Sequence, residues 1–136
     1  MSLLPRKGLL AIAAVIDVAL NARERPLSAR KLAARHNLPP RHLEPVLQAL
    51  VHERIFNGIR GPRGGYELAR ELRRISVADV LRAAGDDGEA DSAKGSRILD
   101  DIVLPALAEA ERAFAAALAQ LSIEDLTRRA ETLRDR

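Results

Sequence analysis

The segment from Asn37 to Arg74 constrains the fold of this 136-residue chain more than any other part of it. It opens with a proline-rich turn, and the apolar residues that follow recur at three- and four-residue spacing, which predicts a helix from about Pro40 to Glu53. Short apolar runs then flank the string Gly61-Pro62-Arg63-Gly64-Gly65. Because glycine permits positive φ in a tight reversal, this string predicts the tip of a β-hairpin between strands at 55–60 and 66–69.

A second hairpin signal, Asn57-Gly58, lies inside the first of these strands. A turn there would leave only about three residues on either side before the next breaker, so we place the main turn at 61–65.

Two helices are predicted ahead of this segment. The stretch from Gly8 to Ala22 is apolar on almost every side and predicts a helix buried between other elements, with Asp17 as the residue that faces solvent or a partner. Ser28 is a suitable N-cap for a short amphipathic helix that ends at about His36. A short helix, the turn at 37–40 and a second helix are typical of a helix-turn-helix, and the hairpin makes it a winged helix.

The second half of the chain predicts further helices. Ser76 and Asp79 form a capping box in outline for a helix that ends at about Ala84, and residues 85–97 read as a polar loop. Beyond the loop, apolar residues alternate at four- and three-residue steps along a helix long enough to outreach so small a domain. Pro105 should kink this helix or mark a second start. Ser122 with Asp125 caps a last helix, which is largely polar and expected to fray.

The long helix has a stripe of small residues along which two backbones could approach closely. Packing onto its own domain is the alternative, but we favour dimerisation. The predicted dimerisation residues are Leu99, Val103, Ala106, Ala110, Ala113, Phe114 and Ala117.

The predicted fold class is therefore mainly α with a small β-hairpin: a winged helix-turn-helix plus a long C-terminal dimerisation helix. The domains are a winged helix-turn-helix at 1–84, a polar loop at 85–97, and a dimerisation helix with a C-terminal tail at 98–136.

Charge is distributed unevenly along the chain. Residues 1–84 carry 15 Lys and Arg against 7 Asp and Glu, net +8, whereas residues 85–136 carry 7 against 12, net −5. The basic half is the candidate for contact with a polyanion. Aromatic residues make up only 2% of the chain, which leaves little material for stacking single-stranded bases.

Several classes of protein are disfavoured by features that the sequence lacks. It has no cysteine, so disulfides, cysteine nucleophiles and thiolate-held clusters are excluded. The apolar run from Leu9 to Leu20 is interrupted by Asp17, lacks a small-x-small cleavage site and is too short to span a membrane. We therefore expect a cytoplasmic protein that does not enter a membrane.

From Pro5 to about Ala84, the chain resembles bacterial winged-helix transcription regulators of the IscR/NsrR/CymR type. The most specific parts of the resemblance are Leu43-Glu44 with Val46-Leu47-Gln48, and the run from Ile59 to Arg70 that contains the hairpin tip. The resemblance implies a homodimer on a partly palindromic operator, with long helices crossing at the dimer axis and wings at the minor groove. Several members of the family sense through an iron–sulfur cluster held by three cysteines in the loop before the long helix. This chain has none there, so it resembles members without a cluster, and no cofactor is predicted.

The predicted DNA-binding residues fall into three groups. Wing arginines are suited to the negative potential of a narrow minor groove. Polar residues of the third helix are suited to base edges or phosphates in the major groove, and basic residues of the second helix to phosphates. The set is Arg30, Lys31, Arg35, Arg41, His42, Glu44, Gln48, Arg60 and Arg63.

Alternatives remain open for several of these residues. Arg41 could bind guanine or phosphate, and Gln48 could face DNA or solvent. Glu44 could accept a hydrogen bond from cytosine N4, the role of the glutamate that the family carries here, or stabilise the helix N-terminus. Pro45 replaces a residue that in some relatives is a DNA-contacting glutamine, so an operator sequence cannot be transferred. The basic residues of the second helix could equally be solvated.

Metal binding and catalysis are not predicted. His36, His42 and His52 lack the spacing of a ligand pair, and the acidic cluster at 86–91 lacks the order of a calcium loop. There is also no catalytic constellation and no glycine loop that leads into a helix to hold phosphate.

We predict a dimeric, sequence-specific, double-stranded-DNA-binding transcription regulator, a repressor that blocks promoter access. A winged-helix module that docks onto proteins is the rival reading. A small-molecule effector, a protein effector or no effector is each compatible with the sequence.

Overall fold

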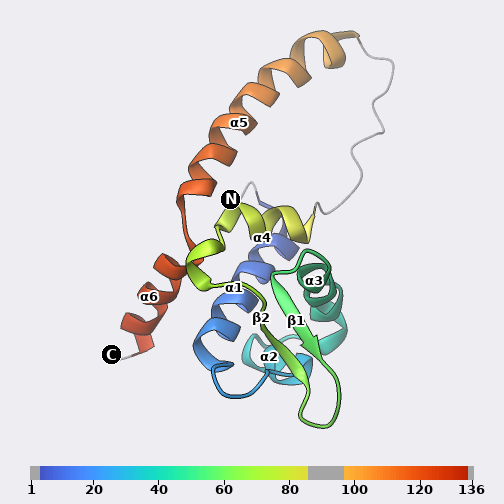
Figure 1. Ribbon diagram of the computed structural model, residues 1–136. Helices are drawn as coiled ribbons and strands as arrows, with labels where there is room; N and C mark the ends of the chain where they lie inside the picture. The colour runs from blue at the N-terminus through green and yellow to red at the C-terminus, as the bar shows by residue number, and fades with distance from the viewer. Residues whose placement is uncertain (1–3, 86–96, 135–136) are drawn as a thin grey trace.

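The computed structural model describes residues 4–85 and 97–134, so most of the predicted polar loop lies outside the described residues. Helices dominate it, and one antiparallel hairpin is the only sheet among the described residues (Figure 1). This confirms the predicted fold class. The elements in chain order are α1 (Arg6–Asn21), α2 (Ala29–Arg35), α3 (Pro40–His52), β1 (Phe56–Ile59), β2 (Gly65–Leu68), the 3-10 turn η1 (Leu72–Arg74), α4 (Val77–Ala84), the π-helical turn η2 (Leu99–Val103), α5 (Leu104–Gln120) and α6 (Ile123–Arg134).

The helix-turn-helix is built from local hydrogen bonds that its sequence encodes. The Ser28 side chain caps α2 by accepting a hydrogen bond from the Lys31 backbone N–H at 3.2 Å. At the other end, Asn37 adopts a φ of 55°, and the Leu38 N–H donates to the Ala33 carbonyl at 2.9 Å. This is a Schellman termination, which satisfies the last carbonyls of α2 and turns the chain into α3.

The hairpin forms where the glycine string predicted it. Phe56 pairs with Leu68 and Ile59 with Gly65, so Asn57-Gly58 lies within β1. The tip closes with a hydrogen bond from the Gly64 N–H to the Gly61 carbonyl at 2.9 Å.

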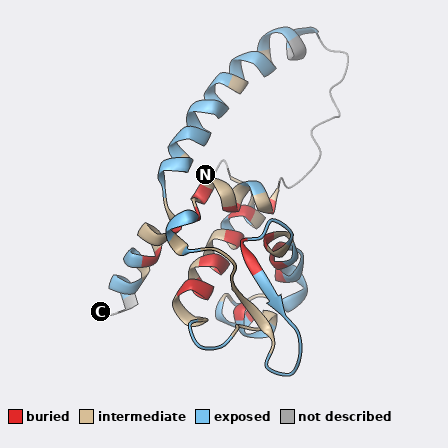
Figure 2. Cartoon of the chain, viewed as in Figure 1, coloured by how far each residue is buried: buried red, intermediate tan, exposed pale blue. Residues whose placement is uncertain are grey.

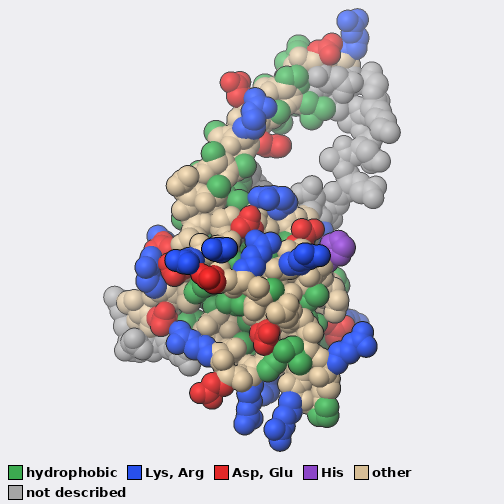
Figure 3. All heavy atoms as spheres, in the orientation of Figure 1, with side chains coloured by type: hydrophobic (Ala, Val, Ile, Leu, Met, Phe, Trp, Pro, Cys, Tyr) green, Lys and Arg blue, Asp and Glu red, His purple; other side chains and the backbone are tan. Residues whose placement is uncertain are grey.

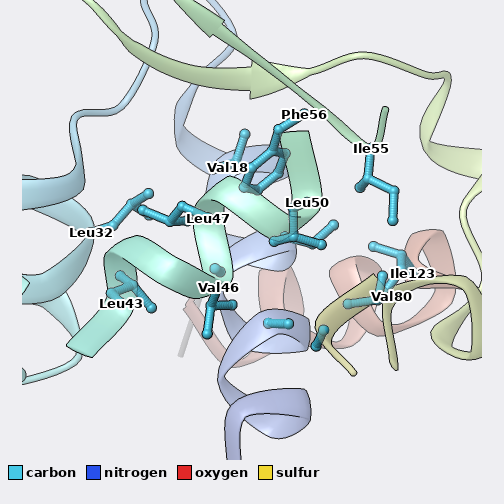
Figure 4. Packing of buried hydrophobic residues seen from close by; sticks show 14 of the residues in the cluster. Val18, Leu32, Leu43, Val46, Leu47, Leu50, Ile55, Phe56, Val80 and Ile123 are labelled. Carbon is cyan, nitrogen blue, oxygen red and sulfur yellow. The ribbon is translucent and has the colours of Figure 1, made fainter. Parts of the chain in front are cut away.

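The hydrophobic core lies where α1, α3, β1, α4 and the start of α6 meet. Figure 4 shows Leu47 and Leu50 of α3 close to Phe56 of β1, with Val80 and Ile123 nearby. All five are at least 99% buried. Because α3 contributes its apolar stripe to this core, its opposite face is left free for another partner.

Asp17 corrects one sequence expectation. We expected it to face solvent or a partner, but its side chain is only 5% exposed. Its carboxylate accepts hydrogen bonds from Arg35 Nε and from Asn21 Nδ2, the latter at 2.6 Å. The prediction was wrong because burying a carboxylate requires partners, and one of them, Arg35, lies on a different helix.

The capping box of α4 is confirmed. Ser76 Oγ accepts from the Asp79 N–H, and an Asp79 oxygen accepts from the Ser76 N–H, both at 3.0 Å. Pro105 lies in the first turn of α5, directly after the π-helical turn η2. Val103, the last residue of η2, is itself helical with φ −69° and ψ −52°, so the helical path continues into α5 without a non-helical break. Pro105, which has no N–H to donate, thus follows the point where the hydrogen-bond pattern changes from π to α.

Helix α5 extends away from the core and has no buried residue (Figures 1 and 2). Among its predicted dimerisation residues, Ala106, Ala110, Ala113, Phe114 and Ala117 are exposed in the single chain, and Val103, in η2, is partly buried. Leu99 begins η2. No helix of the described residues is long and apolar enough to cross a membrane.

Helix α6 differs from the expected frayed tail. Ser122 caps it as predicted, accepting from the Asp125 N–H at 2.9 Å, but the helix also docks on the core. Ile123 is fully buried, and its N–H donates to the Ile75 carbonyl at 3.0 Å. Leu126 packs against the same core and Thr127 is 2% exposed, so residues at three- and four-residue spacing bury one side of α6. The expectation of a frayed tail was wrong because the segments that cover this side, α1 among them, are far away in sequence.

Candidate nucleic-acid interface

The outer face of α3 presents one stripe of exposed side chains, three of which are polar. Leu43, Val46, Leu47 and Leu50 are buried, whereas Arg41, Glu44, Pro45 and Gln48 are exposed. Positions three and four apart lie on the same face of a helix, so these four side chains share one surface. The same geometry that fills the core therefore aligns three of the predicted contact residues.

His42 lies apart from this stripe. It lines a shallow hollow with Arg6 and Lys7 at the start of α1 and with Leu38 in the turn before α3. The structure thus brings His42 next to two further basic residues that were not among the predicted contacts.

The stripe on α3 continues onto the wing. Gln48 Nε2 donates a 3.3 Å hydrogen bond to the Tyr66 hydroxyl, and both residues line a groove that also includes Arg60 and Ser28. The Tyr66 ring in turn packs near Phe56, with centroids 5.9 Å apart. Arg41, Glu44, Gln48 and Arg60 therefore follow one another along a surface that runs from helix to hairpin.

The wing is fixed to the loop between α1 and α2 by backbone hydrogen bonds. Leu27 N–H donates to the Tyr66 carbonyl at 3.0 Å, and Tyr66 N–H donates to the Leu27 carbonyl at 2.8 Å. A Cβ on Gly65 would lie 2.4 Å from the Leu27 carbonyl carbon and oxygen, and its φ is +154°. Only glycine allows this close approach, so the hairpin has a defined position beside α2.

The basic residues of α2 are divided between two environments. Arg30 and Lys31 are exposed, and Lys31 lines a second hollow beside the hairpin tip with Arg25 and Arg63. Arg35 instead binds Asp17, with its Nε 2.7 Å from one carboxylate oxygen, although about half of its side chain remains exposed. The structure thus gives Arg35 a partner within the fold.

Sequence reasoning missed Arg25 and Tyr66. Arg25 lies in the loop between α1 and α2, for which the sequence predicted no contact residue, and Tyr66 entered only within the predicted strand at 66–69. A residue on a loop has no periodicity to reveal its neighbours, so no sequence signal placed Arg25 beside the wing.

Most cations of this surface have no acidic partner. Several other arginines of the described residues do pair with a carboxylate, such as Arg70 with Asp79 at 3.7 Å and Arg73 with Glu71 at 2.7 Å. Figure 3 shows Lys and Arg side chains at the lower end of the molecule, where the hairpin turns. A surface of unpaired cations attracts polyanions. In the described part of the chain, no carboxylate oxygen lies within 4.0 Å of a side-chain nitrogen of Arg25, Arg30, Lys31, Arg41, Arg60 or Arg63.

The side chains do not supply a thiolate cluster site. The sequence has no cysteine, and the described residues contain no group of three His, Asp or Glu side chains that could hold a metal ion. The residues present therefore do not fit a cysteine-held iron–sulfur cluster.

Comparisons with known proteins identify the family of this chain. The model of the Rrf2 family, described as iron-dependent transcriptional regulators, matches residues 4–129. The HTH-type transcriptional regulator IscR of Xenorhabdus nematophila is 31% identical over 137 residues, covering 96% of this chain and 82% of that protein. The putative HTH-type transcriptional regulator BadM of Rhodopseudomonas palustris is 34% identical over 107 residues, covering 69% of this chain and 68% of that protein.

The solved structure of T. potens IscR superposes with a TM-score of 0.74 at 25% identity, covering 96% of this chain and 89% of that one. The family match includes α3, the wing and the helices that follow. This chain belongs to the Rrf2 family of DNA-binding transcriptional regulators.

Proposed function

We propose that this protein is a cytoplasmic, sequence-specific transcription regulator that binds a partly palindromic operator as a homodimer and represses by blocking promoter access. The observation that carries the proposal is the continuous surface from α3 to the wing, joined by the Gln48–Tyr66 hydrogen bond. A helix face and a hairpin tip side by side fit the adjacent major and minor grooves of one DNA duplex.

Glu44 is the residue we assign to base reading in the major groove. It lies beyond the first turn of α3, where stabilisation by the helix dipole is weak. Its side chain is exposed and has no cationic partner within 4.0 Å among the described residues. A carboxylate in a DNA-facing helix repels phosphate, and its favourable role is to accept from cytosine N4. Arg41, on the same stripe, is suited to guanine or to phosphate.

Phosphate contacts supply affinity, and the wing supplies a second reading site. Arg30 and Lys31 on α2 would hold the backbone, which fixes the register without reading sequence. Arg60 would enter the minor groove, where a narrow groove attracts guanidinium groups.

The homodimer would form through α5. Its large apolar side chains remain exposed in the single chain, including Phe114 at 42% and Leu107 at 54%. A helix that extends from the core with an uncovered apolar stripe buries that stripe when a second copy packs against it. Two copies would then present two reading surfaces to paired half-sites.

We do not extend iron dependence to this chain, although the family description names it. The cluster ligands it would need are thiolates, and the sequence has none. Any effector would therefore act by chemistry other than cysteine-held iron.

The test is selection of genomic DNA fragments by the purified protein at near-physiological salt, followed by sequencing. The proposal expects paired half-sites whose centres lie about one helical turn apart, or a multiple of it. Glu44→Ala should then relax the preference at one base pair by about 1–3 kcal/mol. Binding without sequence preference would instead favour a winged-helix module that docks onto proteins.

A further inference from the structure

Two arginines of the wing lie in different surroundings. Arg60 lines the groove between the hairpin and α3, together with Gln48 and Tyr66. Arg63 lines the hollow beside the hairpin tip, together with Arg25 and Lys31. The two arginines therefore need not contact the same part of a DNA duplex, although they are only three residues apart in the sequence.

The second hollow is held in place by the backbone. Leu27, two residues after Arg25, exchanges two hydrogen bonds with Tyr66 of the hairpin. Gly65 permits this contact because a side chain there would overlap the Leu27 carbonyl group. Lys31 lies in the first turn of α2, where its N–H is held by Ser28. Three cations from a loop, a helix and a hairpin tip are thus brought together by fixed elements.

These three cations line one hollow, and no carboxylate of residues 4–85 or 97–134 forms an ion pair with them. Glu24 precedes Arg25 in the sequence, yet no oxygen of Glu24 lies within 4.0 Å of Arg25, Lys31 or Arg63 among the described residues. By contrast, Arg23 in the same loop has an acidic neighbour, with its Nη2 3.9 Å from Glu131. Grouping like charges is unfavourable in the free protein, and a bound anion removes that cost.

We infer that Arg25, Lys31 and Arg63 form a clamp for one backbone phosphate of DNA, which leaves Arg60 as the wing residue that reads the minor groove. This inference rests on the proposed function. Both walls of a minor groove are lined by phosphates, so a hairpin inserted there brings a phosphate against its flank. The clamp offers an anion three cationic side chains rather than base-specific contacts.

The experiment measures operator affinity as a function of salt for the full-length protein carrying Arg25→Ala, Lys31→Ala, Arg63→Ala or Arg60→Ala. Arg23→Ala is the matched control, since it removes the same charge from the same loop outside the hollow. Each clamp variant should reduce the slope of log affinity against log salt by up to about one and leave the preferred sequence unchanged. The double variant of Arg25 and Lys31 should lose less affinity than the sum of the single losses, because both act on one phosphate. Arg60→Ala should alter the sequence preference as well.

Three outcomes would overturn the clamp. If the wild-type protein binds DNA and Arg25→Ala behaves as Arg23→Ala does, the clamp is wrong and the proposed function stands. If the wild-type protein binds no DNA at low salt, both fail. If calorimetry shows that pyrophosphate binds the free protein and that Arg25→Ala abolishes this without affecting DNA binding, the hollow serves a free anion instead.

Discussion

The Arg35 Nε donates hydrogen bonds to both carboxylate oxygens of Asp17, at 2.7 and 2.8 Å. This contact joins the last turn of α2 to α1, directly before the turn that leads into α3. His36 adds a ring nitrogen 3.2 Å from the same carboxylate, although outside hydrogen-bond geometry. One buried carboxylate therefore helps to orient the helix-turn-helix, together with the apolar packing of Leu32 and Ala33 on the core.

Removing Arg35 should destabilise the fold. Arg35→Ala leaves the buried Asp17 carboxylate without its cationic hydrogen-bond donor, and we expect a loss of about 1–3 kcal/mol in the free energy of unfolding, less than for a fully buried pair because Arg35 is half exposed. Urea unfolding at a fixed protein concentration measures this loss in the free energy of unfolding. Arg73→Ala is the control, since its pair with Glu71 is exposed on both sides and should be worth less than about 1 kcal/mol. Unchanged stability of Arg35→Ala with weakened DNA affinity would instead make Arg35 a phosphate contact.

Replacing Gly65 should displace the wing. Gly65→Ala places a methyl group against the Leu27 carbonyl at a strained φ, and the strain alone should destabilise the fold by about 1–3 kcal/mol. Thermal and urea unfolding report this loss. In Gly58→Ala the new Cβ would meet nothing closer than 3.8 Å, so the free energy of unfolding should stay the same or rise by about 0.4–1 kcal/mol. Equal behaviour of the two variants would show that the Leu27–Tyr66 contact does not position the hairpin.

Truncating Ile123 should show that α6 belongs to the folded core. Ile123 is fully buried, so Ile123→Ala should lower the free energy of unfolding by about 2–4 kcal/mol. Leu133, on the same helix, is 73% exposed, and Leu133→Ala should change stability by less than about 0.5 kcal/mol. A negligible effect of Ile123→Ala would indicate that α6 detaches from the core in solution.

Placing a charge on the α5 stripe should produce a monomer. In Phe114→Glu a carboxylate would be buried in the proposed dimer interface, where an unpaired charge is strongly unfavourable. Sedimentation velocity should report a dimer for the wild-type protein and a monomer for this variant. Arg112→Ala changes an exposed residue of the same helix on a different face and should remain dimeric. A wild-type monomer, or a dimeric Phe114→Glu, would remove the assigned interface.

The sequence by itself determined the local architecture. The apolar spacing of α3, the Ser28 cap, the box of Ser76 and Asp79 and the glycines of the hairpin tip each act over a few residues. Helix and turn signals of this range can be read directly because the interacting groups are neighbours in the chain. They were sufficient to predict the winged helix and the exposed face that carries Arg41, Glu44 and Gln48.

Only the tertiary structure decided which distant residues meet. It buried Asp17 beside Arg35, brought Arg25 to Arg63 through the pairing of Leu27 with Tyr66, and docked Ile123 beside Ile75. Each contact joins two segments that are far apart in the sequence. The spacing of residues along one helix or strand therefore cannot reveal which residue of the other segment lies against it. The reason is physical: burial of a charge or an apolar side chain is set by whatever the rest of the chain packs against it, and that is a property of the assembled core.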